Sequence, residues 1–577
     1  MKIKIILLIF ILITLCQFKT LAQCNTTRAQ DSIALVRLFD ATSGKSWTKT
    51  WDIGKPMSGW FGVTLGTGGR VIKLKLPNNN VGGTLPVELA SLCALQTLDL
   101  SRNTITGILP TQMFLLTSLD TLRLNYNQLS GQIPRFISYS LTILDVGNNQ
   151  FTGTFPSLDS ANYLQTLYLN NNKIGGTLPV SFFNTHYNLQ NFSIRFNQFT
   201  GTIPAEISNL YYLIQLDLSV NQLTGSIPSS IGTINALEIL GISNNALTGV
   251  IPTSFGNLKN LKTLDLGSNK LVSPLPTSLG NLKKLNYLDL SINQFTDSLP
   301  PQYGGMDSLD LFAISYNQLK GRVPVELAQL KKLAYLDVSY NRFDSLTNFS
   351  NAFPRYLESI RSRRFVVSGN KFTFDDIVPN ISWLGKPSFL FGYLGQDSII
   401  CTAKSTTLTL GASYTIALNI DGGLTSNIYR WYKNGKLIDK TNVNKLTLNN
   451  AQPCQAGNYS CQVTNPAVPG MTLFCPNQTF VFFLGPQSCA PYDVTTFPNP
   501  VQNVLNITIT SPPDDVRFMR LTNMLGQVVL SKRFDEGDIV NGLSIDCANF
   551  PNGSYFLSFF TEGGSVSLTK RVQVLKK

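Results

Sequence analysis

The chain contains 577 residues, and 46 lysines and arginines against 33 acidic residues give it a formal net charge of +13. This length predicts several domains. The basic residues are dispersed and no nucleic-acid-binding motif accompanies them, so they indicate a solvated basic surface, which also suits acidic glycans, rather than a nucleic-acid-binding protein. His186 is the single histidine, which argues against Ser-His-Asp catalysis and histidine-rich metal sites.

Residues 1–22 have the pattern of a secretory signal peptide. Lys2 and Lys4 precede a long apolar stretch, and the segment closes on small residues before Gln23, where cleavage is expected. A lipoprotein signal is the weaker alternative, because Gln23 is not the small residue that such signals carry before the cysteine, here Cys24. No later segment is long and apolar enough to span a bilayer.

Removing this segment leaves an even number of cysteines, which in an exported chain suggests disulfides. Cys24 and Cys93 are one candidate pair, because both flank the first unit of the repeats that follow. No CxxC pair occurs, which argues against a metal cluster.

Residues 23–70 predict an amino-terminal cap. Ala34, Leu35, Leu38 and Phe39 suit one face of a helix, and three tryptophans follow at Trp47, Trp51 and Trp60. A solenoid has to cover its first apolar layer, so these aromatic side chains indicate a cap rather than a ligand-binding box.

Residues 71–346 repeat with a fixed period. Leu213, Leu237 and Leu261 begin nearly identical units 24 residues apart, which indicates a solenoid. Within each unit an alternating apolar pair predicts a short strand with one buried face. An asparagine follows, whose amide can pair with backbone groups at a turn, and then glycine and proline, which disfavour a regular helix on the return. The asparagine recurs at Asn79, Asn103, Asn127, Asn149, Asn172, Asn197, Asn221, Asn245, Asn269, Asn293, Asn317, Asn341 and Asn370.

The unit LxxLxLxxNxLxGxIP resembles the plant-type leucine-rich repeat. The resemblance covers about half of the chain and implies a horseshoe-shaped solenoid with a parallel β-sheet on its concave side and little regular helix. The interval lengthens to 29 residues between Asn341 and Asn370, so residues 347–395 are expected to hold the last repeat and a C-terminal cap.

Residues 396–485 alternate as strands do, with Asn434-Gly435 as a hairpin turn. Trp431, Tyr459 and Cys461 resemble the core of an immunoglobulin-like sandwich. No cysteine lies in the earlier strand near Ile416, so Cys461 is expected to pair elsewhere or to stay free.

Residues 486–577 predict a second small all-β sandwich. Pro498-Asn499-Pro500, Leu525-Gly526-Gln527, Gly553 with Tyr555 and the basic terminus closely resemble the type A C-terminal sorting domain of the type IX secretion system. The resemblance implies export across the outer membrane of a Gram-negative bacterium, with the protein secreted or attached to the cell surface and the type IX machinery as a partner.

The candidate ligand-binding residues are exposed aromatic and apolar positions on the expected concave face. The first group occupies three consecutive units: Tyr287, Ile292, Tyr316, Tyr335 and Tyr340. A second, more scattered group comprises Tyr126, Tyr168 and Phe196. Tyrosine combines an apolar ring with a hydroxyl, which suits protein and sugar recognition.

A row of aspartates offers the main alternative. Asp265 and Asp289 are expected to be strand neighbours, close enough for a cation or for acid-base chemistry, but such residues are commonplace in these repeats and a solvated row is favoured. We therefore expect a non-catalytic protein with no cofactor that recognises a protein or polysaccharide. The alternative is a surface hydrolase, or a subunit of one, that binds substrate through the repeats.

Overall fold

The fold is described from a computed structural model. The structure describes residues 26–135, 138–346, 348–349, 363–383, 389–396, 404–409, 411–418, 424–451, 455–483, 493–510, 516–533, 543–561 and 566–576. The chain divides into two compact units, Met1–Asp397 and Ser398–Lys577, and each is treated by itself. The expected signal peptide and Cys24 lie outside the described residues.

The first unit begins with the predicted cap. Helix α2 (Arg28–Ala41) starts at a capping box formed by Thr27 and Gln30, and it buries one apolar face. Trp47, Trp51 and Trp60 are all at most 5% exposed. Trp51 stacks on Trp60 and meets Trp47 edge-on, with ring centroids 5.0 and 4.8 Å apart. These rings therefore form one buried aromatic cluster that precedes the first repeat strand.

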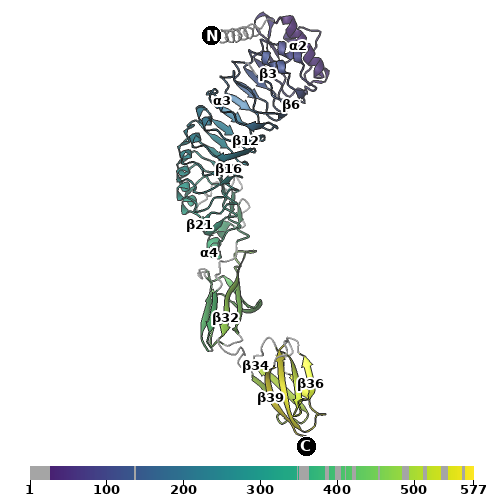
Figure 1. The fold of residues 1–577 in the computed structure, drawn as a ribbon, viewed down its shortest axis with the longest axis vertical. Coiled ribbons are helices and arrows are strands. Elements are labelled where there is room, and N and C mark those ends of the chain that lie inside the picture. The colour runs from purple at the N-terminus through teal and green to yellow at the C-terminus, as the bar shows by residue number, and fades with distance from the viewer. Residues whose placement is uncertain are drawn as a thin grey trace, which may run out of the picture. The chain divides into compact units, whose positions relative to one another are not determined.

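A single 15-stranded sheet, here called sheet A, runs along the first unit (Figure 1). β1 (Val63–Leu65) joins it antiparallel to β2, and all later pairs are parallel. The parallel strands, in spatial order, are β2 (Val71–Lys75), β3 (Thr97–Asp99), β5 (Thr121–Arg123), β7 (Ile143–Asp145), β9 (Thr166–Tyr168), β11 (Asn191–Ser193), β13 (Gln215–Asp217), β15 (Ile239–Gly241), β17 (Thr263–Asp265), β19 (Tyr287–Asp289), β20 (Leu311–Ala313), β22 (Tyr335–Asp337), β24 (Arg363–Val366) and β25 (Phe389–Gly392).

The return segments contain little regular α-helix, as the glycine and proline of most units predict. Most are five-residue 3-10 helices: η4 (Val87–Ser91), η5 (Thr111–Leu115), η6 (Ala205–Asn209), η7 (Ser229–Thr233), η8 (Thr253–Asn257), η9 (Thr277–Asn281), η10 (Pro301–Gly305) and η11 (Val325–Gln329). α3 (Val180–Phe183) is a single α-helical turn. Between sheet A and these helices lie three smaller parallel sheets: β4 (Thr106–Ile108), β6 (Gln128–Gln132) and β8 (Gln150–Thr152); β10 (Gly175–Thr177), β12 (Gln198–Thr202), β14 (Gln222–Ser226), β16 (Ala246–Gly249) and β18 (Lys270–Leu271); and β21 (Lys320–Arg322) with β23 (Arg342–Ser345).

Sheet A continues one strand beyond the last recurrent asparagine. β24 follows the predicted frame, α4 (Phe374–Ile377) and η13 (Val378–Trp383) follow it, and β25 then pairs with β24. In this added coil Gln396 takes the place of the asparagine. Its Nε2 donates to the Val367 carbonyl at 3.1 Å and its Oε1 accepts from the Asn370 N–H at 3.2 Å. Glutamine, one methylene longer than asparagine, thus makes the hydrogen bonds of the turn after β25, a turn that the repeated asparagine does not predict.

The second unit opens with an all-β region. One sheet holds β26 (Lys404–Leu408), β32 (Thr472–Phe483), β31 (Gly457–Thr464), β28 (Ile428–Lys433) and β29 (Lys436–Thr441), and a second pairs β27 (Tyr414–Ala417) with β30 (Lys445–Leu448). Trp431 is fully buried. The Tyr459 hydroxyl donates to the Gln455 carbonyl at 2.6 Å, the contact expected of a tyrosine corner. Cys461 is buried and free, whereas Cys475 and, in the first unit, Cys93 are disulfide-bonded.

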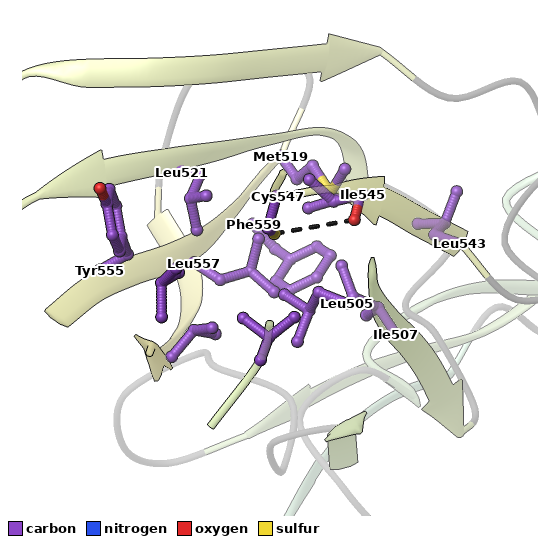
Figure 2. Close-up of a cluster of buried hydrophobic side chains, with 13 residues drawn as sticks. Leu505, Ile507, Met519, Leu521, Leu543, Ile545, Cys547, Tyr555, Leu557 and Phe559 are labelled. Carbon is purple, nitrogen blue, oxygen red and sulfur yellow. Dashed lines mark hydrogen bonds between the residues drawn. The ribbon is translucent and has the colours of Figure 1, made fainter. Parts of the chain in front are cut away.

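The remaining strands form two further antiparallel sheets. They are β33 (Asp493–Phe497), β34 (Val504–Thr510) and β37 (Leu543–Asp546), and then β36 (Val528–Arg533), β35 (Val516–Asn523), β38 (Gly553–Thr561) and β39 (Val566–Val574). Figure 2 shows their shared core, in which Leu505, Met519, Leu557 and Phe559 point toward one another. Buried Cys547 donates from Sγ to the Ile545 carbonyl within this core.

Candidate ligand-binding surface

The exposed face of sheet A carries the first part of the candidate surface. In each three-residue parallel strand of sheet A the central side chain is buried and its two neighbours point outward; in β19, Leu288 is fully buried while Tyr287 and Asp289 are half-buried. This alternation follows from the period of two in a strand. We call this outward side the sheet face.

The aspartates on the sheet face shape the turns that follow the strands. Each accepts the backbone N–H two residues later on Oδ1, at 2.8 to 3.2 Å, in the pairs Asp99–Ser101, Asp145–Gly147, Asp217–Ser219, Asp265–Gly267, Asp289–Ser291 and Asp337–Ser339. Asp265 and Asp289 are register partners, as predicted. The expected solvated row is therefore a row of half-buried turn-forming side chains, and the pattern explains aspartate there without catalysis.

Tyr287 and Tyr335 lie on the sheet face in register with each other. Each pairs with Leu311 of the strand between them, so about 10 Å separates their strands. The Tyr335 hydroxyl donates to Asp337 Oδ2 at 3.2 Å. Burial, followed by the adjacent carboxylates, raises the pKa of both phenols to about 12. Both rings thus stay neutral and keep a hydroxyl at the surface over a wide pH range.

A second set of side chains lies at the turn after the strands, directly before each asparagine. Ile292, Tyr316 and Tyr340 belong to this position and are 52%, 53% and 49% exposed. All three have left-handed backbone, with φ of 54°, 54° and 51°. The rings of Tyr316 and Tyr340 stack with centroids 4.3 Å apart and planes 15° apart. We call this set the turn row.

Gly369 occupies the turn-row position in the next coil, with φ of 63°. A Cβ atom at Gly369 would lie 2.7 Å from the Tyr340 ring. Since Cβ atoms do not approach that closely, the missing side chain makes room for the stacked pair. The first predicted group is therefore brought together as two neighbouring bands, Tyr287 and Tyr335 on the sheet face and Ile292, Tyr316 and Tyr340 in the turn row.

The second predicted group remains scattered. Tyr126 and Phe196 are exposed turn-row residues, each with an arginine over its ring: Arg102 at 4.7 Å and Arg195 at 4.9 Å from the centroids. Tyr168 lies instead on the sheet face in β9, where burial raises its phenol pKa. The structure does not assemble these three into one patch.

The left-handed turn row is the feature that residue spacing alone does not predict. A signal was nevertheless present, because Asn148, Asn171 and Asn244 occupy this position in other coils, and asparagine tolerates left-handed backbone better than most residues. Bulky residues in the same conformation, among them Val220, Tyr316 and Tyr340, carry a larger conformational cost.

His186 and the possible metal-binding side chains were the other candidates for a catalytic or metal site. His186 is 1% exposed, stacks on Phe182 and lies within 2.8 Å of the Phe182 carbonyl and 3.2 Å of the Leu158 carbonyl. Burial lowers the pKa of His186. Its side chain packs in the core beside the return segment α3. In the described part of the chain, no three His, Cys, Asp or Glu side chains come close enough to hold a metal ion.

Comparison with protein families agrees with this architecture. Residues 70–129 and 235–295 match one leucine-rich repeat model, and residues 140–160, 163–185, 188–210 and 212–234 match another. The chain therefore contains leucine-rich repeats between residues 70 and 295. Residues 397–465 match an immunoglobulin domain, and residues 495–574 match a secretion system C-terminal sorting domain. No helix among the described residues is long and apolar enough to cross a membrane.

Individual relatives resemble the repeat region. A probable leucine-rich repeat receptor-like protein kinase of Arabidopsis thaliana is 34% identical over 93 residues, 16% of this chain and 10% of its own length. The leucine-rich repeat ectodomain of the receptor kinase GASSHO1/SCHENGEN3 from Arabidopsis thaliana is 28% identical, with a TM-score of 0.41, over 56% of this chain and 44% of that one. An internalin from Listeria monocytogenes is 18% identical, with a TM-score of 0.42, over 56% of this chain and 90% of that one. The chain thus spans less than half the length of the first two.

Proposed function

We propose that this protein is a non-catalytic binding protein, secreted or attached to the outer cell surface, whose repeats recognise a protein or polysaccharide. The ligand surface consists of Tyr287 and Tyr335 on the sheet face and Ile292, Tyr316 and Tyr340 in the turn row. The sorting domain is the part of the chain that the type IX machinery reads, and the immunoglobulin-like region is a spacer or second contact.

The stacked pair Tyr316 and Tyr340 carries this proposal. Because both rings are half exposed to water, they add little to the free energy of folding. Both residues also have left-handed backbone, which costs free energy. Aromatic side chains that are already ordered lose little conformational freedom when a ligand covers them, which favours their use as anchors.

A hydrolase, or a hydrolase subunit that binds substrate through the repeats, is the second candidate. The carboxylates of Asp265 and Asp289 are its best catalytic pair, since they are register neighbours and burial raises the pKa of Asp265. Their Oδ1 atoms, however, already accept turn N–H groups. A screen of the purified protein against glycan and peptide substrates separates the two candidates, because only a hydrolase releases product.

The binding surface is tested with the mature chain, residues 23–577, on panels of glycans and surface proteins. For a ligand found there, Tyr316→Ala with Tyr335→Ala should weaken binding by about 2 kcal/mol or more, roughly thirtyfold in Kd, because aromatic anchors carry a large share of interface energy. Tyr126→Ala with Phe196→Ala is the matched control and should leave Kd unchanged. The reverse pattern would move the site to the coils around β5 to β11.

A further inference from the structure

A second row of exposed aromatic side chains lies at the opposite edge of sheet A from the turn row. It comprises Tyr139, Tyr163, Tyr187, Tyr211 and Tyr212, which are 46% to 64% exposed. Each lies one or two residues before the fully buried leucine that leads into β7, β9, β11 or β13, so four consecutive coils contribute. All these strands are parallel, so residues that precede them share one edge and turn-row residues share the other. In Figure 1 these coils belong to the part of the solenoid between the labels β6 and β16.

The backbone that carries these tyrosines is ordered by contacts between coils. Asn188 Nδ2 donates to the Asn162 carbonyl at 3.2 Å, and Asn209 Nδ2 donates to Asn184 Oδ1 at 2.9 Å. The Tyr187 hydroxyl donates to the Asn184 carbonyl. The rings of Tyr187 and Tyr211 are nearly parallel, 13° apart, with centroids 6.3 Å apart. Neighbouring coils thus hold the backbone around Tyr163, Tyr187 and Tyr211 in place while these rings stay exposed, and a cluster of exposed aromatic side chains of this kind marks an interaction site.

After one coil with Asn235 and Ala236 at these positions, lysines occupy them in later coils. Lys259 lies two residues before Leu261, and the two residues before Leu285 and before Leu333 are the pairs Lys283–Lys284 and Lys331–Lys332. Asp307 interrupts the series but forms an ion pair with Lys283 at 3.4 Å, and Lys262 just beyond this row pairs with Glu238 at 2.6 Å. Lys259 and Lys284 donate to uncharged oxygens, of Gly256 and Asn260, so their charge is not neutralised. One edge therefore presents aromatic rings followed by net positive charge.

We propose that this edge, the tyrosine row with the lysine segment that continues it, binds an acidic polysaccharide lengthwise. Tyrosine rings supply apolar contact for the faces of pyranose residues, and the lysines attract carboxylate or sulfate groups. The coils repeat about every 4.8 Å, close to the length of one pyranose residue, so a periodic polymer meets equivalent groups on successive coils. Repeated aromatic rings followed by unneutralised lysines suit a polymer of repeated acidic sugar units, so the occupant proposed is a polysaccharide.

The test uses the mature full-length protein with polygalacturonate as the carboxylated probe, dextran sulfate as the sulfated probe and dextran as the neutral one. Binding is measured by affinity electrophoresis or calorimetry at about 50 and 500 mM salt, because screening weakens exposed charge contacts. The variants are Tyr163→Ala/Tyr187→Ala/Tyr211→Ala and Lys284→Gln/Lys331→Gln/Lys332→Gln. Tyr126→Ala/Phe196→Ala, in the turn row at the opposite edge and outside the ligand surface proposed above, is the matched control. All changed side chains are exposed, and an unchanged thermal melt of each variant confirms that it is folded.

We expect binding to at least one acidic polymer, none to dextran, and a loss of about tenfold or more in affinity in both edge variants. The lysine variant should also lose most of its salt dependence, whereas the tyrosine variant should keep it. Absence of binding, equal binding of dextran, or unchanged affinity in the tyrosine variant would overturn the proposal. So would loss of binding in the Tyr126/Phe196 control alone, or a protein ligand that depends on the tyrosine row when no polysaccharide binds. None of these results alters the test with Tyr316 and Tyr335, which uses a different edge and a different ligand screen.

Discussion

Asn221 shows how one side chain joins neighbouring coils. Its Nδ2 donates to the Ile194 carbonyl of the preceding coil and to the Leu218 carbonyl of its own, both at 3.1 Å, and its Oδ1 accepts from the Phe199 N–H at 3.0 Å. The Asn221 amide bonds to backbone groups, not to the asparagine amides of neighbouring coils as it would in a side-chain ladder. Each satisfies backbone groups that the turn leaves unpaired, which explains why aspartate, lacking the donors, does not replace asparagine there.

Asp145 provides a pH-dependent test at the residue scale. Burial raises its pKa from 3.8 to about 6, against the Gly147 N–H and Arg123, which lower it. The folded state thus disfavours the ionised form, a penalty that is complete above about pH 6 and absent below about pH 3.8. Asp145→Asn keeps an oxygen for the Gly147 N–H and removes the penalty. We expect it to stabilise the solenoid by about 1 to 3 kcal/mol at pH 8.

The measurement is urea unfolding of wild type and Asp145→Asn at several pH values. The difference between the two should shrink as the pH falls through 6 and vanish near pH 3.5, where the wild-type carboxyl is protonated in both states. A constant difference at all pH values would show that packing, not ionisation, separates the two proteins.

At the scale of elements, the regular strands and turns were predictable and the exceptions were not. The spacing of Leu213, Leu237 and Leu261 predicts the register of sheet A because one repeated pattern buries one repeated set of side chains. The sequence pattern did not predict β25, because Gln396 occupies the position where an asparagine is expected. The tyrosines of the candidate site could be placed on coils, but not the stacking of Tyr316 on Tyr340, since ring contacts depend on backbone conformation that spacing does not specify.

A buried ion pair between Asp31 and Arg70 connects the amino-terminal cap to the repeats. Asp31 is fully buried, and Arg70 donates to it twice, from Nε at 2.9 Å and from Nη2 at 3.0 Å, while the Val71 N–H adds a third bond at 2.8 Å. The pair thus ties α2 to the first repeat strand. Arg70→Met leaves a buried carboxylate without its cation and should destabilise the cap by about 3 to 5 kcal/mol.

Denaturant unfolding with tryptophan fluorescence reports this change, because Trp47, Trp51 and Trp60 lie in the cap. Arg37→Met, at an exposed position of the same helix, should change stability little. Asp31→Asn combined with Arg70→Met should recover part of the loss, since it removes the unpaired charge. If Arg70→Met cost no more than Arg37→Met, the ion pair would not hold the cap in place.

At the scale of the whole molecule, the two compact units should unfold separately, because each has its own core. Trp431 tests this separation. Its side chain is fully buried in the immunoglobulin-like region, and its register partner Cys461 is buried beside it. Trp431→Ala should destabilise that region by about 3 to 5 kcal/mol through the cavity it leaves. Calorimetry of the full chain should then show one transition moved to lower temperature and the transition of the repeats unchanged. A shift of both transitions would mean that the repeats and the second unit form one cooperative structure, and the ligand surfaces on the repeats would then be coupled to the second unit.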